Sequence, residues 1–189
     1  MYKIVGAFDI ETDTSEGFGL EPLKGKITEI AVATRTHEHV FVSANESEMI
    51  VRFNNWLMCL PVGEVATWGG ARFDIPFIWT RAQILGIDLD WSLVPAGPVV
   101  KYTPTAPHDG QYEVKFHGRL DHFDIEPLYK NFAQTSSVDW KLKPVSVAKG
   151  MSPIEVDRAN LHLLSPAERE AYAASDARVT YDLAVDYIN

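Results

Sequence analysis

The spacing of hydrophobic residues along the chain divides it into segments typical of strands and segments typical of helices. Apolar runs or alternations that predict strands cover residues 3–10, 27–34, 39–43, 64–68 and 119–125. Apolar residues at helical spacing predict helices at 47–60, with Ser47 as the N-cap, and at 76–86, which begins with proline and ends with glycine. Turn-forming residues at 17–25 predict a loop between the first two strands.

The second half of the chain predicts shorter elements and one long helix. Short helices are expected at 126–132, with Asp124 as the N-cap, and at 143–150. Ser165, Pro166 and Glu168 have the types and spacing of an N-cap, a first-turn proline and a capping-box acid. A long helix-compatible stretch follows them, so we expect the final helix to begin after Ser165.

A β-hairpin is predicted over residues 99–118. The segments VVKYTP and QYEVKF flank the turn-rich stretch APHDG. We therefore expect these two segments to pair as an insertion in the main fold.

The order of the elements predicts an α/β fold. The first three strands are joined by short turns and should be antiparallel, whereas later strands are separated by helices and should be parallel. A mixed sheet with helices on its faces follows. Because no repeat or linker divides the chain, we expect residues 1–189 to form a single domain.

Composition narrows the class of protein. The chain is 46% hydrophobic and 23% charged, which is typical of an ordered globular domain. Cys59 is the only cysteine, so an intramolecular disulfide is excluded. No apolar run has membrane-spanning length, and MYKIVGAFDIE lacks the pattern of a secretory signal. We expect no membrane partner and a cytoplasmic location (the host cytoplasm if the source is viral).

The formal net charge of −9 argues against broad electrostatic binding of nucleic acid, which usually needs a basic face. It argues less against an enzyme that reaches a few phosphates through metal ions, because bound divalent cations invert the local electrostatics.

Three carboxylates crowd the stretch FDIETDT. Side chains alternate between the two faces of a strand, so Asp9 and Glu11 point the same way. Asp13 lies among turn-forming residues and is expected in the turn after the strand. A buried carboxylate needs a partner, and no Lys or Arg follows closely after Lys3.

Two further segments carry candidate acids. Asp74, in WGGARFDIPFI, could join the first-strand acids or could simply be a helix N-cap ahead of Pro76. Tyr172 and Asp176 lie four residues apart and share one helix face, which is also ordinary for a surface pair. The alanines around them would allow close packing on a sheet and bring Asp176 toward Asp9.

Taken in order, FDIET, WGG-x-x-FDIPFI and Y-x-x-x-D resemble the three exonuclease blocks of the DnaQ-like (DEDD) superfamily. The chain most resembles the 3′→5′ proofreading exonuclease domain of family B DNA polymerases, which implies a ribonuclease H-like fold. Ala171 stands where the histidine branch has His, so the tyrosine branch (DEDDy) is the better match.

The resemblance also implies roles for individual residues. Tyr172 would orient the attacking water, and Thr12 and Phe73 would contact the substrate strand. Family B polymerases usually have Asn at the position of Gly69, where it is thought to help hold that strand. The four acids that would bind metal ions are Asp9, Glu11, Asp74 and Asp176.

The implied chemistry is hydrolysis of phosphodiester bonds by a two-metal-ion mechanism. Mg²⁺ and Mn²⁺ prefer oxygen ligands, and two such ions about 4 Å apart can clamp the attacking and leaving oxygens. The expected products are nucleoside 5′-monophosphates from the 3′ end of single-stranded DNA, with RNA not excluded. No polymerase module is recognised, so we expect a stand-alone enzyme that proofreads or repairs with a separate DNA polymerase.

Two other functions stay open at this point. A nuclease-like fold could serve as a non-catalytic nucleic-acid-binding or assembly module. A phosphatase with an Asp nucleophile is also conceivable at Asp9, although that class normally has Asp where this chain has Glu11.

Overall fold

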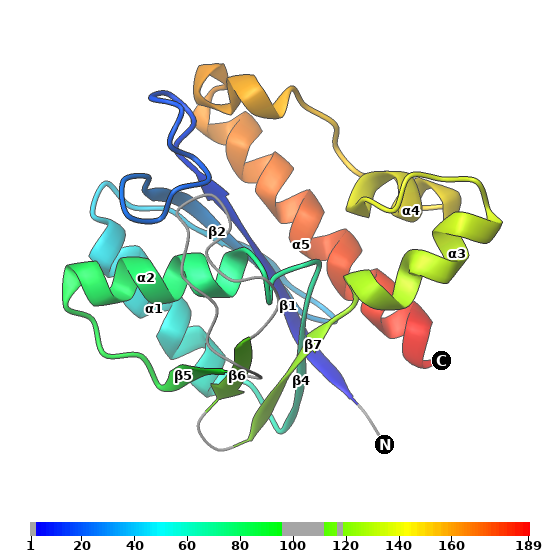
Figure 1. The fold of residues 1–189 in the computed structure, drawn as a ribbon, viewed down its shortest axis with the longest axis horizontal. Helices are drawn as coiled ribbons and strands as arrows, with labels where there is room; N and C mark the ends of the chain where they lie inside the picture. The colour runs from blue at the N-terminus through cyan, green and yellow to red at the C-terminus, as the bar shows by residue number, and fades with distance from the viewer. Residues whose placement is uncertain (1–2, 96–111, 117–118) are drawn as a thin grey trace.

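A computed structural model describes residues 3–95, 112–116 and 119–189, and its centre is a five-stranded mixed sheet with the order β3-β2-β1-β4-β7 (Figure 1). The strands of this sheet are β1 (Ile4–Thr12), β2 (Ile27–Ala33), β3 (Glu38–Phe41), β4 (Gly63–Thr67) and β7 (Leu120–Asp124). β1 is antiparallel to β2, and β2 to β3, whereas β4 and β7 run parallel to β1 and β4. The predicted α/β class, with antiparallel strands followed by parallel ones, is confirmed.

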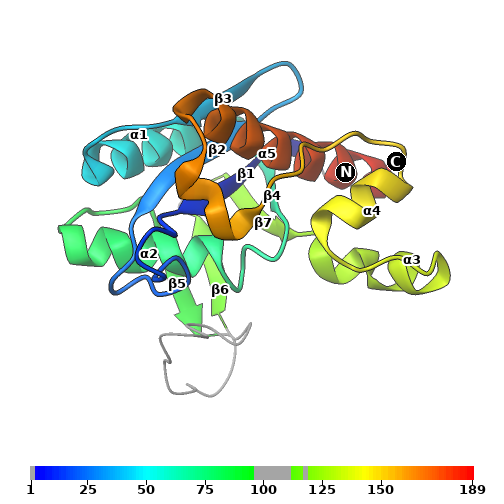
Figure 2. The ribbon, with the colours of Figure 1, turned by 90° about the horizontal axis from the view of Figure 1, so that it is seen from above.

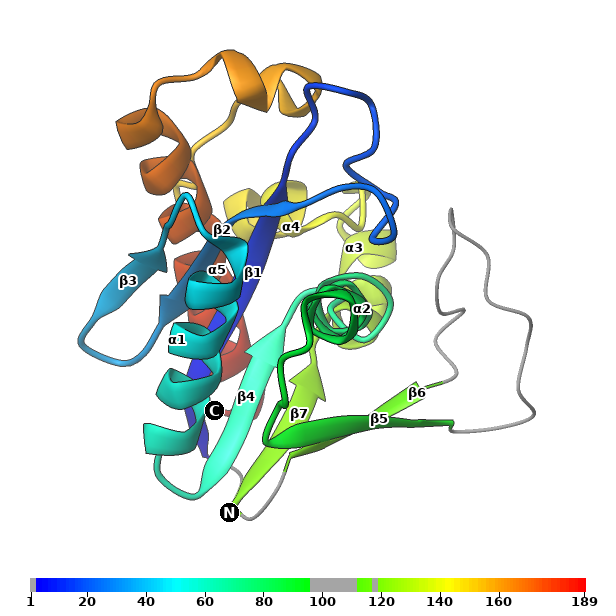
Figure 3. The ribbon, with the colours of Figure 1, turned by 90° about the vertical axis from the view of Figure 1, so that its left-hand side faces the viewer.

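Helices cover both faces of this sheet. α1 (Glu46–Cys59) and α2 (Asp74–Leu85) lie on the near side in Figure 3, with α5 (Pro166–Ile188) behind β1. Four shorter elements complete the α5 side: η1 (Glu126–Tyr129), α3 (Lys130–Thr135), α4 (Leu142–Ala148) and η2 (Arg158–Leu163). None of the helices in the described ranges combines the length and apolar character needed to cross a membrane.

The face covered by α1 and α2 carries large side chains. Phe8 and Ile10 of β1 point into it together with Phe53 of α1 and Ile75 of α2. Phe8 and Phe53 meet edge to face with ring centroids 4.9 Å apart. The even-numbered positions at the end of β1 therefore anchor the sheet to α1 and α2, which turns Asp9 and Glu11 to the opposite face.

The face covered by α5 carries small side chains. Ala31 and Ala66, from the two strands that flank β1, are fully buried there against Ala173 and Ala177 of α5. Alanine on both surfaces lets the helix axis come close to the sheet, since no long side chain stands between them. This close approach is what brings residues of α5 to the end of β1.

Local signals identified the start of α5 correctly but missed the start of α1. Ser165 and Glu168 form the predicted reciprocal capping box. The N-cap of α1 is Asn45 rather than Ser47, because Asn45 has an extended backbone and its side chain accepts a hydrogen bond from the Ser47 N–H. Ser47 thus lies inside the first turn of the helix.

The predicted hairpin is only partly observed. Segment 99–104 lies outside the described residues, whereas β6 (Tyr112–Phe116) pairs antiparallel with β5 (Trp91–Pro95), which had no predicted strand. Buried Trp91 fixes this pairing, since its ring lies 5.9 Å from the Trp79 ring and 6.0 Å from that of Phe116. The β5–β6 pair projects away from the main sheet (Figure 2).

Candidate active site

β1 positions the first two acids. It ends at Thr12, so Asp9 and Glu11 lie on the strand, on the face covered by α5. Asp13 lies beyond the strand, and its Oδ1 accepts a hydrogen bond from the Ser15 N–H at 2.9 Å. The predicted division of FDIETDT between strand and turn is therefore confirmed.

α5 supplies a third acid to the same point. Asp176 is fully buried, and one carboxylate oxygen from each of Asp9, Glu11 and Asp176 lies within 4.8 Å of the others. Cation–oxygen bonds of about 2.1 Å for Mg²⁺ place opposite ligands roughly 4.2 Å apart. With an upper limit of 4.8 Å between them, the three oxygens need at most a small side-chain adjustment to share one ion.

Asp74 approaches the cluster from the other covered face. It is the first residue of α2, it is buried, and its Oδ1 accepts a hydrogen bond from the Ile10 N–H of β1 at 3.2 Å. The N-cap position belongs to Phe73, which makes no side-chain cap hydrogen bond. The alternative interpretation of Asp74 as a plain helix cap is therefore wrong, because its carboxylate bonds to β1.

Burial and mutual repulsion raise the pKa values of the acids. Burial, followed by the charges of Asp74, Glu11 and Asp176, raises the pKa of Asp9 well above its ordinary value. Burial and then the Asp176 charge raise the pKa of Glu11 to about 8. Burial likewise raises the pKa of Asp74 to about 7, although the hydrogen bond from the Ile10 N–H lowers it in part. Without a counter-charge, the ionised forms of these clustered carboxylates are therefore unfavourable.

The donor set fits hard divalent cations. Glu11 Oε1 is buried and has no hydrogen-bond partner among the described residues. A buried carboxylate oxygen without a partner is costly, and a metal ion would satisfy it. All the converging donors are carboxylate oxygens, which Mg²⁺ and Mn²⁺ prefer over sulfur or imidazole nitrogen.

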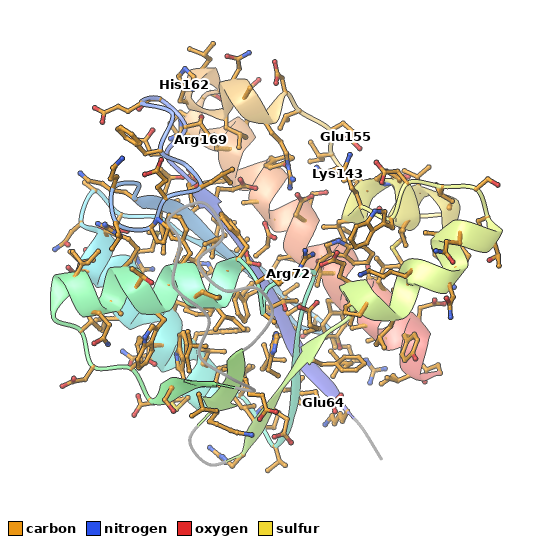
Figure 4. The ribbon with its side chains drawn as sticks, in the orientation of Figure 1. Glu64, Arg72, Lys143, Glu155, His162 and Arg169 are labelled. Carbon is orange, nitrogen blue, oxygen red and sulfur yellow. The ribbon has the colours of Figure 1, made fainter. Side chains whose placement is uncertain are left out.

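Lys143 is a counter-charge that the sequence did not reveal. Its Nζ lies 3.0 Å from Asp176 Oδ1 and 3.8 Å from the centroid of the Tyr172 ring, and it also donates to the Ile154 carbonyl. The Lys143 side chain is only 9% exposed, so it is a fixed part of the site beside α5 (Figure 4). The available signal was a lysine between buried Leu142 and Val145 of α4.

Arg158, the first residue of η2, is a second unexpected cation. Its Nε donates a hydrogen bond to the Tyr172 hydroxyl at 2.8 Å, and its Nη2 lies 3.7 Å from Asp176 Oδ2. In contrast to Lys143, the Arg158 side chain is 68% exposed. No local pattern identified the partner of either cation, because both reach the acids only through the fold.

Tyr172 lies one helical turn before Asp176 and is fully buried. Burial, followed by the charges of Asp176 and Glu11, raises the pKa of its hydroxyl above the ordinary value of 10.0. The hydroxyl therefore keeps its proton at neutral pH. This supports the interpretation of Tyr172 as a hydrogen-bonding group rather than a base.

The two predicted substrate contacts are the chain neighbours of Glu11 and Asp74. Thr12 is nearly buried, and its hydroxyl donates to the Gly19 carbonyl at 2.6 Å. Phe73 is half-buried directly before Asp74, and its ring centroid lies 5.4 Å from that of Phe77. Contact of either residue with a substrate stays a prediction.

The loop before α2 explains the glycine at position 69. Gly69 has φ +69, and a Cβ there would lie 2.6 Å from Glu126 Oε2, which pairs with Arg72. The Asp124 carboxylate accepts hydrogen bonds from the Gly69 N–H at 2.8 Å and the Ala71 N–H at 3.1 Å. The Arg72–Glu126 pair thus occupies the space in which an Asn side chain at 69 would begin.

Asp124 makes a capping hydrogen bond but does not have the predicted N-cap position. It is the last residue of β7, and the N-cap of the following η1 is Ile125, without a side-chain cap hydrogen bond. The predicted cap position was wrong by one residue, but Asp124 Oδ1 still accepts a hydrogen bond from the Glu126 N–H at the start of η1, at 3.2 Å. The same carboxylate holds the loop that leads to Asp74, more than fifty residues away in sequence.

A protein-family model matches the middle of the chain. The model for "DNA polymerase family B, exonuclease domain" matches residues 33–145, more than half of the chain. This range contains Asp74, whereas the β1 and α5 residues of the site lie outside it.

Similar proteins include a DNA polymerase of Thermococcus litoralis, 29% identical over 203 residues that cover 96% of this chain and 11% of the relative. The catalytic polypeptide of DNA polymerase epsilon from Arabidopsis thaliana is 31% identical over 149 residues, covering 77% of this chain and 6% of the relative. The chain spans only a small part of the length of the relatives it matches.

A similar solved structure is that of the family B DNA polymerase from the hyperthermophilic archaeon Pyrobaculum calidifontis. It superimposes with a TM-score of 0.69 at 23% sequence identity and covers 97% of this chain and 24% of the polymerase chain. At this identity the likeness shows the fold.

Proposed function

The chain belongs to the exonuclease-domain family of family B DNA polymerases, and on this premise we propose that it hydrolyses phosphodiester bonds at the 3′ end of single-stranded DNA. The observation that carries the proposal is the convergence of carboxylate oxygens from Asp9, Glu11 and Asp176 within 4.8 Å. These residues come from distant segments, and the fold holds them together against strong mutual repulsion.

Two divalent cations, Mg²⁺ or Mn²⁺, are the proposed cofactors. Asp9, Glu11 and Asp176 would hold them, with Asp74 completing the set from α2. When bound, such ions supply a hydroxide nucleophile at neutral pH and stabilise the charge on the departing oxygen. The unpartnered Glu11 oxygen and the raised pKa values of the acids support this assignment.

The side chains around the acids position the reacting groups. Tyr172 keeps its proton and offers a hydroxyl hydrogen bond at the edge of the cluster, where it can orient a water. Lys143 contacts both Asp176 and the face of the Tyr172 ring, so it fixes the two α5 residues relative to each other. The packing of α5 on the sheet excludes bulk water from behind the acids.

The proposed products are nucleoside 5′-monophosphates, released one at a time. All five proposed catalytic residues lie within these 189 residues, so we propose that the chain acts with its own residues. Cooperation with a separate DNA polymerase in proofreading or repair is part of the same proposal, supported by the polymerase relatives.

A labelled-substrate assay tests the function. Single-stranded DNA and RNA labelled at the 5′ or the 3′ end are incubated with the chain and Mg²⁺ or Mn²⁺. We expect stepwise shortening of DNA from the 3′ end, lost in Asp9→Ala and in EDTA. Binding without shortening would instead indicate a non-catalytic module, and phosphate release from monoesters without shortening would indicate a phosphatase.

A further inference from the structure

Two cations reach the acid cluster, and their surroundings differ in a way that separates their roles. Lys143 is nearly buried and is held by three partners: Asp176, the Tyr172 ring and the Ile154 carbonyl. Arg158 is 68% exposed and is held by one 2.8 Å hydrogen bond and one looser 3.7 Å ion pair. Packing therefore fixes Lys143 in place, whereas the exposed Arg158 side chain is free to swing into solvent once the acids no longer attract it.

We propose that Arg158 is an exchangeable counter-ion of the acid cluster, which leaves Asp176 when divalent cations bind and then binds a phosphate of the substrate strand. The proposal deepens the proposed exonuclease function and rests on it. It adds a substrate-binding residue from a segment that belongs to none of the three sequence motifs.

Arg158 and the divalent cations compete because both bind the same carboxylates. The two oxygens of the Asp176 carboxylate face different cations: Oδ2 faces Arg158 Nη2, and Oδ1 faces Lys143 Nζ. The Arg158 charge also lowers the pKa values of Asp9, Glu11, Asp74 and Asp176, which places it within electrostatic reach of all four acids. Divalent cations on these acids would repel a guanidinium at that distance.

The guanidinium cannot avoid this repulsion by losing its proton, because arginine stays charged at any physiological pH. It must move, and its largely exposed side chain can swing outward into solvent, where the guanidinium is hydrated. The anion that enters the site during the reaction is a phosphodiester, and the planar fork of guanidinium N–H donors matches phosphate oxygens. Phosphate is therefore the natural second partner of Arg158.

The backbone around Arg158 is fixed on both sides, so only the side chain needs to move. Before it, the Ile154 N–H donates to Ser175 Oγ of α5 at 2.9 Å. After it, His162 shares a 3.0 Å hydrogen bond with the Thr14 hydroxyl in the loop after β1. These anchors hold the guanidinium within reach of the cluster whether or not it contacts Asp176.

Metal and DNA binding in Arg158→Gln test the proposal without turnover. Titration with Mn²⁺ alone, followed by calorimetry, should show binding roughly two- to fivefold tighter than in the wild type, the range for removal of an exposed ion pair. Binding of a labelled single-stranded oligonucleotide in Ca²⁺, followed by anisotropy, should be at least about tenfold weaker, as expected for loss of a charged hydrogen bond.

Arg158→Lys tests the positive charge separately from the planar arrangement of guanidinium N–H donors. This variant should bind Mn²⁺ like the wild type but still bind the oligonucleotide more weakly, because lysine cannot make the bidentate contact. Arg52→Gln, on the surface of α1, is the matched control and should change neither measurement.

Unchanged or weaker Mn²⁺ binding in Arg158→Gln would refute the exchange, and unchanged oligonucleotide binding would refute the phosphate contact. Failure of the proposed function has a different signature, since the wild-type chain would then not shorten DNA at all. Circular dichroism melting of each variant checks that the fold is intact.

Discussion

At the scale of single residues, the site depends on where β1 stops. Asp9 and Glu11 precede the end of the strand at Thr12, and Asp13 follows it in a turn held by its own carboxylate. Thr12 alone thus separates Glu11, whose carboxylate belongs to the buried cluster, from Asp13, whose carboxylate belongs to the turn. Chemically similar changes on the two sides of Thr12 should have very different effects.

Glu11→Gln should lower exonuclease turnover at least about 100-fold, since even the outer partners of metal ligands can contribute that much. Asp13→Asn should leave turnover within about twofold, because its carboxylate bonds only within the turn. Initial rates on single-stranded DNA in Mg²⁺ measure both. Equal losses in the two variants would show that Asp13 also belongs to the metal site.

Gly69→Ala should destabilise the chain by about 1–3 kcal/mol. Part of the loss is the strain of a left-handed backbone, and part is displacement of the Glu126 carboxylate, which would lie 2.6 Å from the new Cβ. Urea denaturation measures the change in the free energy of unfolding.

Gly86→Ala is the matched control, because Gly86 has φ +68 but a Cβ there would contact nothing within 4 Å. It should show the strain alone, about 1 kcal/mol. If both variants lose the same stability, the Arg72–Glu126 pair does not restrict position 69.

At the scale of elements, α5 determines whether the acids meet. The helix carries Tyr172 and Asp176, and its close approach depends on Ala173 and Ala177, which are fully buried against small residues of the sheet. Figure 1 shows α5 running alongside β1 over much of its length. The distance between helix and strand is thus set by alanines one turn apart.

Ala177→Leu should push α5 away from the sheet. Overpacking of this kind costs about 1–3 kcal/mol, and the displacement of Asp176 should lower Mn²⁺ affinity as well. Thermal melting and Mn²⁺ titration measure the two effects. Ala171→Leu, on the exposed side of the same helix, should change the melting temperature little and leave Mn²⁺ affinity intact.

Sequence periodicity predicted the helices and strands better than the tertiary contacts of their side chains. The two-residue period placed Asp9 and Glu11 on one face, and the alanines around Tyr172 predicted the approach of α5. Lys143 and Arg158 could not be predicted, because no local pattern marks a side chain that finds its partner through tertiary packing. The prediction of Ser47 rather than Asn45 as the N-cap was wrong because both residue types are suitable caps and only the backbone conformation distinguishes them.

At the scale of the whole molecule, the buried acids link stability to pH. The pKa of Glu11 rises from 4.5 to about 8 and that of Asp74 from 3.8 to about 7 on folding. Between the ordinary and raised values, the folded chain holds protons that the unfolded chain has lost. Stability from these groups is therefore highest below about pH 4 and is lost as the pH rises toward 8.

Without metal, this contribution to the free energy of unfolding should fall by at least about 1.4 kcal/mol between about pH 5 and pH 8, the equivalent of one pKa unit. Saturating Mg²⁺ should abolish the fall, because metal binding favours the ionised carboxylates. Denaturation at both pH values, in EDTA and in Mg²⁺, measures this.

The double variant Glu11→Gln, Asp74→Asn isolates the cluster from other titrating groups. It should show a shallower pH dependence in EDTA and little stabilisation by Mg²⁺. An unchanged slope in the double variant would show that the pH dependence arises elsewhere in the molecule.

The division of the acids between β1 and α5 also has a consequence during protein synthesis. A ribosome releases Asp9, Glu11 and Asp74 long before Asp176, and α5 can dock only after the preceding elements have formed their surface. A nascent chain therefore lacks the carboxylate that closes the site. Because α5 supplies Asp176, the proposed nuclease stays inactive until α5 docks, and a nascent chain without α5 poses no threat to nucleic acid nearby.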